Sequence, residues 1–405
     1  MYKKIFGFLI TSLLIGSIII TIPSVLACTG FTASEGNTVL VGNNEDWWHP
    51  DSYIRVTPPS GTSYGRIIFD VKFPLPSSQN YYSAFGGMND QGLFFDVYSH
   101  PTLVPVNSSD KPDFNVGEIA RYIIRVCETV DEVVEKFDQY NLELMDDIQY
   151  FFVDRTGNSV IIEGDEIIYK DGDYQVITNF LQSNPSHGWY PCWRYDTAVS
   201  MLENMTELSV DYFRDICDAT HQEYYLNPTQ YSNIYDLNRG LIYIYHFYNY
   251  DKVVEINMSE EFEKGPHSIY LPSLFEPIGN KPPNIPSNLD GPLSGSNGNE
   301  YTYSCDLTID PDNNPDEIYY MFDWGDYSNS DWIKPSSSSD RISASHVWVE
   351  EGIYEIRVKS RDIFGCESNW SNPLEVSMPK IKTFDDFNPW LFRLIQRFPI
   401  LEFLM

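Results

Sequence analysis

The sequence predicts an α+β domain of layered sheet and helix, followed by a smaller all-β domain. Strand-like runs stand before and after a stretch at 116–140 in which apolar residues recur at helical spacing. A proline-rich connector, KPPNIP at 281–286, then changes the composition of the chain. Beyond it, short strand-like runs follow one another at the spacing of a β-sandwich.

Residues 1–27 have the pattern of a secretory signal. Lys3 and Lys4 precede an apolar run at 5–22, and Val25-Leu26-Ala27 presents small or medium side chains to a signal peptidase. We therefore expect export and a mature chain that begins at Cys28. An uncleaved membrane anchor is the alternative, since the run is nearly long enough to span a bilayer.

Cys28 would then carry a thiol and a free α-amine on one residue. Because an α-amine titrates near about pH 8, part of it is free at neutral pH to accept the thiol proton. Alternating runs at 28–33 and 38–43 flank the turn sequence SEGN, which predicts a hairpin. This hairpin would bring Asn43, Asn44 and Asp46 beside Cys28.

The remaining elements of the first domain are predicted by local patterns. The helical stretch splits where Thr129 can cap a second helix, and Cys127 lies on its apolar stripe as a core residue. The other expected elements are a strand at 66–73, a strand, glycine-punctuated turn and second strand within 85–95, a meander at 149–179, helices at 193–204 and 210–220, and a hairpin of 240–249 with 253–256.

Composition limits the chemistry. The formal net charge of −32 argues against nucleic acid as a partner. Outside the cell, Cys192 with Cys217 and Cys305 with Cys366 are candidate disulfides, although the sequence leaves the pairing open. Neither C-x-x-C nor H-E-x-x-H spacing occurs, so we expect no metal site and no cofactor.

Five short motifs follow one another over roughly residues 28–280. They are CTGF at 28–31, GNNED at 42–46, GMNDQGL at 87–93, VITN at 176–179 and PCWRY at 191–195. In kind and in order they resemble the motifs of the choloylglycine hydrolase and penicillin V acylase family of linear amide C–N hydrolases. The resemblance implies an N-terminal nucleophile fold, a four-layer αββα sandwich.

The resemblance also implies roles for four residues. Cys28 would be nucleophile and base, Asp46 the partner of its α-amine, Asn179 an oxyanion or orienting donor, and Arg194 a positive charge near the thiol. Plainer interpretations remain open: a solvated loop carboxylate for Asp46, a turn residue for Asn179 and a surface ion pair for Arg194.

Further candidates for substrate or oxyanion contacts are Asn43, Asn89, Ser99 and Trp47. Asn43 stands where the family has arginine, and Ser99 where it has another asparagine, which puts the substrate in doubt. Trp47 is a candidate wall for an apolar acyl pocket, or a core residue. The GNNEDW form is also similar to acyltransferase and dipeptidase branches of the same fold.

Two rival chemistries involve the same region. His49 and His187 lie near the motifs, but no cysteine-protease signature accompanies Cys28. The sequence VLAC at 25–28 also approximates a lipoprotein processing site. Lipid on the sulfur and an acyl group on the nitrogen would then remove both catalytic groups and leave a tethered binding protein.

The second domain resembles a PKD-type immunoglobulin-like module. The motifs are FDWGD at 322–326, SHVW at 345–348 and GIYEIRV at 352–358. Such modules are spacers or adhesion elements on exported proteins. The acidic loop at 310–314 is a candidate calcium ligand set or a solvated turn. The apolar tail is too interrupted for a membrane span, so we expect it at a membrane surface, on a partner or on its own protein.

The sequence therefore predicts a secreted, cell-surface-associated amidohydrolase that cleaves a small N-acyl compound through an acyl-thioester. The alternatives are an acyltransferase on the same site and a lipid-anchored binding or adhesion protein. The expected parts are a signal at 1–27, the amidohydrolase domain at 28–280, a linker at 281–299, the β-sandwich at 300–380 and the tail at 381–405. Bile salts, penicillins, N-acyl amino acids and lactone signals are all compatible with the motifs.

Overall fold

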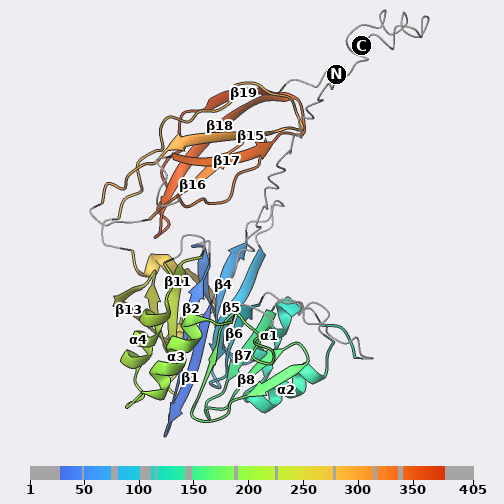
Figure 1. Ribbon diagram of the computed structural model, residues 1–405, viewed down its shortest axis with the longest axis vertical. Helices are drawn as coiled ribbons and strands as arrows, with labels where there is room; N and C mark the ends of the chain where they lie inside the picture. The colour runs from blue at the N-terminus through green and yellow to red at the C-terminus, as the bar shows by residue number, and fades with distance from the viewer. Residues whose placement is uncertain are drawn as a thin grey trace, which may run out of the picture.

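The computed structural model is mostly β-sheet with few helices (Figure 1). It describes residues 28–47, 50–73, 81–100, 111–114, 116–141, 148–186, 190–223, 227–276, 280–312, 317–335 and 341–378. The predicted signal, the apolar tail, Trp48, His49, His187 and part of the acidic loop lie outside these residues. No helix among the described residues is long and apolar enough to cross a membrane.

In the first sheet, Cys28 lies immediately before strand β1. The six strands of this sheet are antiparallel neighbours in the order β10-β1-β2-β11-β12-β13. Their bounds are β1 Thr29–Glu35, β2 Thr38–Asp46, β10 Tyr174–Ile177, β11 Thr229–Asp236, β12 Leu241–His246 and β13 Asn249–Asn257.

The β1–β2 hairpin confirms the expected turn. Thr29 pairs with Asn44 and Glu35 with Thr38, which leaves Gly36-Asn37 as the connection. Gly36 has φ of 60°, a left-handed conformation that a residue without a Cβ adopts without strain. The hairpin therefore aligns the GNNED motif with the start of β1, which Cys28 immediately precedes.

The second sheet has eight antiparallel strands in the order β14-β3-β4-β5-β6-β7-β8-β9. Their bounds are β3 Ser52–Thr57, β4 Arg66–Phe73, β5 Tyr81–Asn89, β6 Phe94–Ser99, β7 Ile148–Val153, β8 Ser159–Glu163, β9 Glu166–Tyr169 and β14 His267–Tyr270. A short helix α5, Met258–Glu263, and a 3₁₀ turn η1, Leu271–Leu274, flank β14.

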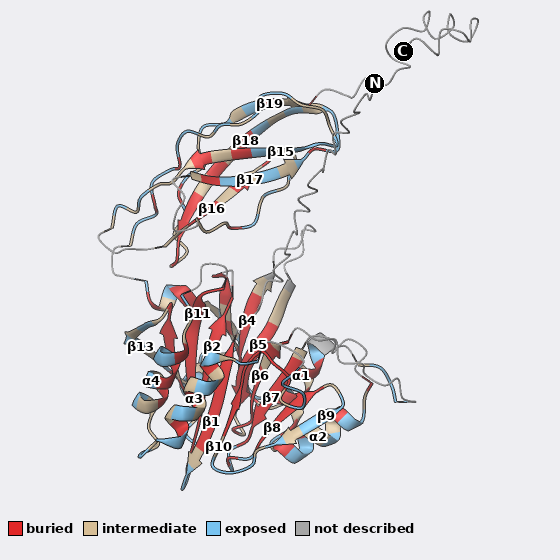
Figure 2. Ribbon diagram, in the orientation of Figure 1, coloured by how far each residue is buried: buried red, intermediate tan, exposed pale blue. Residues whose placement is uncertain are grey.

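The two sheets share one buried apolar cluster. Val41 of β2 and Tyr231 of β11 pack there with Phe69 of β4 and Phe94 of β6. Because side chains alternate along a strand, the opposite faces of both sheets remain for the helices. Figure 2 shows the central strands of both sheets buried along most of their length, with exposed positions on the helices and on the edge strands β9 and β13.

Helices cover those opposite faces. Helices α1, Val116–Val126, and α2, Val130–Asp138, pack their apolar stripes on the second sheet. Helices α3, Trp193–Glu203, and α4, Val210–Thr220, do the same on the first sheet. The predicted cap is confirmed, because Thr129 and Glu132 form a reciprocal capping box at the start of α2.

The C-terminal part contains the short strands that the sequence predicts. They are β15 Glu300–Asp306, β16 Ile318–Asp323, β17 Arg341–Val347, β18 Gly352–Asp362 and β19 Leu374–Met378. β15 pairs with β17, and β16, β18 and β19 form a second sheet around a core that includes Trp324 and Trp348.

This part also contacts the first domain through a buried ion pair. Arg361 of β18 donates to the Asp51 carboxylate at 2.7 Å, and the two side chains are 7% and 9% exposed. The Arg361 guanidinium lies 4.3 Å from the centre of the Trp332 ring. Asn280 adds a hydrogen bond of 2.7 Å to Asp362.

The candidate disulfides are not formed. All six cysteines lie within the described ranges and each is a free thiol. Cys217 is buried between α4 and the first sheet, whereas Cys192 stands before α3 as its N-cap. Cys305 belongs to the sandwich core, while Cys366 lies in the loop after β18. The paired positions therefore occupy different environments, and Cys127 is a core residue as predicted.

Candidate active site

Cys28 lies immediately before β1 and is almost closed off from solvent. Its side chain belongs to the cluster between the two sheets and is 2% exposed. The thiol donates a hydrogen bond to Oε1 of Glu45 at 3.3 Å. Burial raises the pKa of the thiol well above its ordinary value, and the nearby carboxylates of Glu45 and Asp46 raise it further.

Strand β2 presents two different polar faces around this thiol. Asn43 and Glu45 point into the space between the sheets, where Tyr98 of β6 donates to Oδ1 of Asn43 at 2.9 Å. Asn44 points the other way and donates to the Cys217 carbonyl on α4 at 2.9 Å. This alternation is the ordinary period of a strand. It places the GNNED motif partly beside the thiol and partly under α4.

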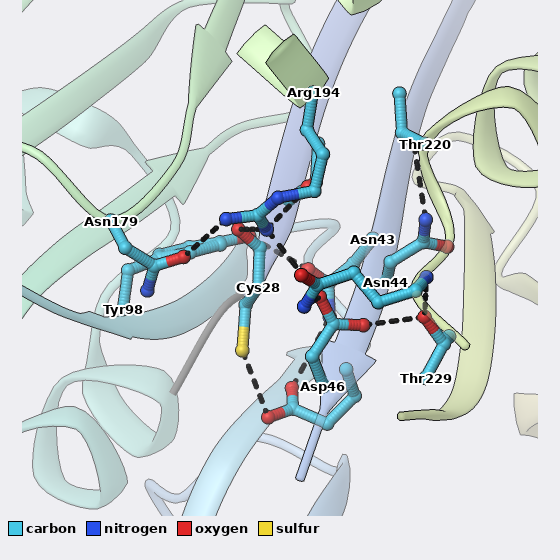
Figure 3. A network of polar contacts seen from close by, with 12 residues as sticks. Cys28, Asn43, Asn44, Asp46, Tyr98, Asn179, Arg194, Thr220 and Thr229 are labelled. Carbon is cyan, nitrogen blue, oxygen red and sulfur yellow. Dashed lines mark hydrogen bonds and ion pairs between the residues drawn. The ribbon is translucent and has the colours of Figure 1, made fainter. Parts of the chain in front are cut away.

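Arg194 joins the predicted site residues to one another (Figure 3). One terminal nitrogen donates to the Cys28 carbonyl at 2.8 Å and lies 3.4 Å from the Asp46 carboxylate. The other donates to Oδ1 of Asn179 at 3.2 Å. Arg194 is in the first turn of α3 and only 6% exposed, so it does not form a surface ion pair.

Asp46 is a buried carboxylate at the end of β2 rather than a solvated loop residue. It accepts hydrogen bonds from the Thr229 hydroxyl at 2.5 Å and from the Gln222 amide at 2.8 Å. Burial raises the pKa of Asp46 to about 7, while Arg194 and these two donors oppose the rise. The carboxyl group is therefore close to titration at neutral pH.

Asn179 follows β10 and is held on both ends of its amide. Its Nδ2 donates to the Ser99 carbonyl at 2.9 Å, and its Oδ1 accepts from Arg194. Ser99 thus meets the site through its backbone. Next to it, Gln149 donates to the Thr178 carbonyl at 2.6 Å, which fixes the preceding residue as well. This network orients the Asn179 side chain.

Two predicted contact residues have structural partners instead. Asn89 donates to the carbonyls of Ile124 and Cys127 at 3.0 and 2.8 Å, and it accepts from the backbone of the turn that follows it. It ties that turn to the end of α1. Trp47 is 5% exposed and packs edge-on against Phe85 at 5.1 Å, which is core packing.

Glu45 is the functional candidate that residue-type reasoning missed. It is 1% exposed, and burial raises the pKa of its carboxyl to about 8. Asp96 of β6 is a second buried carboxyl whose pKa is raised by burial and by Glu45. The GNNED motif already indicated this position, because Glu45 lies two residues after Asn43 and therefore on the same face of β2.

A protein-family model matches part of the chain. Residues 75–211 match the model of linear amide C-N hydrolases, choloylglycine hydrolase family, a span that includes Asn179 and Arg194 but not Cys28 or Asp46. No curated protein sequence matches the chain. The family match supports a hydrolase of the linear amide C–N class. Over these residues, the predicted resemblance to the choloylglycine hydrolase family is confirmed.

Three solved structures are similar to parts of the chain. Two are variants of the conjugated bile acid hydrolase from Clostridium perfringens, at 16% and 15% identity, each covering 60% of this chain and 96% and 95% of their own, with TM-scores of 0.46 and 0.45. The third is the PKD domain of an M14-like peptidase from Thermoplasmatales archaeon SCGC AB-540-F20. It has 44% identity over 25% of this chain and 100% of its own, with a TM-score of 0.22. The C-terminal part is thus similar to a PKD domain.

Proposed function

We propose that this protein is an exported amidohydrolase with an N-terminal cysteine nucleophile, which cleaves a small N-acyl amide. The proposed fold is the four-layer αββα arrangement of that class. It is supported by the apolar cluster shared between the two sheets and by the helix pairs on their opposite faces.

The observation that carries the proposal is the set of contacts between Arg194, Cys28, Asp46 and Asn179. Loss of residues 1–27 would free the α-amine of Cys28 near the Asp46 carboxylate, since one nitrogen of Arg194 reaches both residues. A carboxylate accepts hydrogen bonds from an amine and keeps it oriented. The α-amine can then accept the thiol proton.

The proposed reaction has two stages. In the first, the Cys28 sulfur bonds to the amide carbon, the tetrahedral oxyanion collapses, and the amine leaves with a proton, which gives an acyl-thioester. In the second, water attacks the thioester, and the carboxylic acid leaves as the sulfur regains its proton. An amide N–H directed at the oxyanion, the role proposed for Asn179, is worth about 3 kcal/mol of transition-state stabilisation.

A lipid-anchored protein fits this site less well. The Cys28 sulfur is buried between the sheets and donates to Glu45. A diacylglyceryl group on that sulfur would have to displace the surrounding core. An acyltransferase uses the same first stage and differs only in the acceptor, so an added acceptor amine distinguishes it.

The β-sandwich and the location complete the proposal. We propose that the enzyme acts outside the cell, at a cell surface. The sandwich would serve as a spacer that is fixed to the enzyme domain by the Arg361–Asp51 ion pair. The substrate would be a small N-acyl compound.

The experiment is a hydrolysis assay of the mature chain on a panel of glycine amides, in which the glycine nitrogen carries a phenoxyacetyl, octanoyl, palmitoyl or cholyl group. Wild type should release glycine from at least one amide, and Cys28→Ala should abolish release while its thermal unfolding stays cooperative. Full activity of Cys28→Ala would contradict the proposal. Transfer of the acyl group to an added amine would instead identify an acyltransferase.

A further inference from the structure

The Cys28 thiol already has a proton acceptor within the folded chain. Oε1 of Glu45 lies 3.3 Å from the sulfur, and Oε2 of the same carboxyl accepts from Asn43 at 3.4 Å. The side chain is 1% exposed, so water does not compete strongly for these positions. The contact is to the atom that forms the bond with substrate, and not to the backbone around it.

Strand periodicity explains why a glutamate lies there. Asn43 and Glu45 share the face of β2 that looks across to β6. The titratable groups that interact electrostatically with Glu45 come from four strands: Cys28 beside β1, Asp46 on β2, Asp96 and Tyr98 on β6, and Tyr231 and Tyr235 on β11. None of these groups is cationic. Arg194 contacts Asp46, on the other face of β2.

Such surroundings favour the protonated carboxyl. Two acids in one low-dielectric space cannot both ionise easily, and burial penalises each of them. The resulting pKa of about 8 for Glu45 allows it to gain and lose a proton near neutral pH. A general acid–base group works best when its pKa lies close to the working pH.

We infer that Glu45 is a catalytic residue of the proposed hydrolysis, which takes the proton of the Cys28 thiol and delivers it to the nitrogen of the leaving amine. This inference rests on the proposed function and assigns the thiol proton to Glu45 in place of the α-amine. The ionised carboxyl accepts the S–H proton as the S–C bond forms. The same proton passes to nitrogen as the C–N bond breaks.

The second half of the cycle restores the site. The Glu45 carboxylate accepts a proton from the water that attacks the thioester carbon. When the C–S bond breaks, that proton returns to the sulfur, and the carboxylic acid product leaves. Each proton taken up by Glu45 is released again, so the carboxyl group is unchanged after one turnover.

The test uses the dependence on the leaving group, because an amine must be protonated to leave whereas para-nitrophenolate need not be. The variant is Glu45→Gln, which keeps the size and polarity of the side chain but cannot take up and release a proton near neutral pH. The probes are the glycine amides named above and the para-nitrophenyl esters of the same acyl groups. Asp96→Asn is the matched control, because Asp96 is a buried acid in the same space whose carboxyl accepts from the Val97 backbone N–H at 2.7 Å.

We expect Glu45→Gln to lower kcat/KM for the amide by about 100-fold or more, the usual scale of general acid–base catalysis. Its ester hydrolysis should fall by a smaller factor, because the ester also loses proton removal from the thiol and from water but needs no proton on its leaving group. The remaining ester activity also shows that the variant folds. The amide-to-ester ratio of Asp96→Asn should equal that of wild type.

Four results would overturn the inference. An unchanged amide rate in Glu45→Gln would show that the carboxyl transfers no proton during the reaction. Equal losses on amide and ester would show that Glu45 delivers no proton to the leaving amine, and a higher KM with unchanged kcat would give it a binding role. In these three cases Cys28→Ala would still be inactive, so the proposed function would stand. A wild-type protein that cleaves neither probe would contradict the function and the role of Glu45 together.

Discussion

The Arg194 guanidinium lies 3.4 Å from the Asp46 carboxylate, and both side chains are nearly closed off from solvent. The pair forms one unit because the same nitrogen that approaches Asp46 also donates to the Cys28 carbonyl. A buried charge of this kind depends on its partner, since an uncompensated buried charge is costly.

We therefore expect Arg194→Met to be strongly destabilising, by about 3–5 kcal/mol, because it leaves Asp46 buried without its cation. Arg194→Lys should restore part of this stability but not the fork of donors that reaches Asn179. Urea unfolding measures the change in stability, and kcat/KM measures the effect of losing the donor to Asn179. The control is Arg214→Met, which removes exposed pairs to Asp211 and Asp215 and should cost less than about 1 kcal/mol. Equal costs at both arginines would contradict the account.

Thr229 sets the ionisation of Asp46. Its hydroxyl donates to Asp46 at 2.5 Å, which stabilises the charged carboxylate and holds down a pKa that burial raises to about 7. Thr229→Val should raise the pKa of Asp46 further. The acidic limb of the pH profile of kcat/KM should then move to higher pH. Thr229→Ser keeps the hydroxyl and should keep the wild-type limb, and a limb at the same pH in all three proteins would exclude this role.

The buried acids predict a sign for the pH dependence of stability. Folding raises the pKa of Glu45 from 4.5 to about 8, so between these values the folded chain holds a proton that the unfolded chain has lost. Glu45 thus favours unfolding increasingly as pH rises through this window. We expect Glu45→Gln to be more stable than wild type at pH 8, with a difference that shrinks towards pH 4. Melting temperatures of both proteins across this range measure it, and a difference that grows towards acid pH would refute the assignment.

The ion pair between the domains predicts a further coupling. Arg361 and Asp51 are both buried, whereas Arg341 and Asp290 form an exposed pair within the sandwich. A double-mutant cycle with Arg361→Met and Asp51→Asn should give a coupling energy above about 1 kcal/mol, and the same cycle at the exposed pair a smaller one. Equal coupling energies would mean that the interdomain pair does not fix the sandwich to the enzyme domain.

Local patterns predicted the elements well because their causes are local. The Gly36-Asn37 turn and the Thr129 cap each depend on a few neighbouring residues. The partners of Asp46 were not predictable in this way. Thr229 and Gln222 reach it only because β11 pairs with β2 across more than 180 residues, and no short pattern records that pairing.

Glu45 and Asn89 show the limits of motif reasoning. Glutamate is seldom fully buried, so its residue type alone does not indicate a site residue. Its alternation with Asn43 along β2 is what places it beside the thiol. Asn89 lies inside a family-like motif, but its side-chain amide forms hydrogen bonds with the following turn and with the end of α1. The hydrogen-bond partners of each residue, rather than its place in a motif, show that Glu45 lies at the candidate site and that Asn89 holds a turn.

In the proposed reaction, the Cys28 sulfur of the mature chain carries the acyl group as a thioester between the two stages. The most direct measurement is the intact mass and N-terminal peptide map of the protein from its native host, before and after an acid quench during turnover of a para-nitrophenyl ester. We expect an unmodified chain that begins at Cys28 and gains one acyl mass on that residue. A diacylglyceryl mass on Cys28, or turnover without an acyl mass there, would contradict the account.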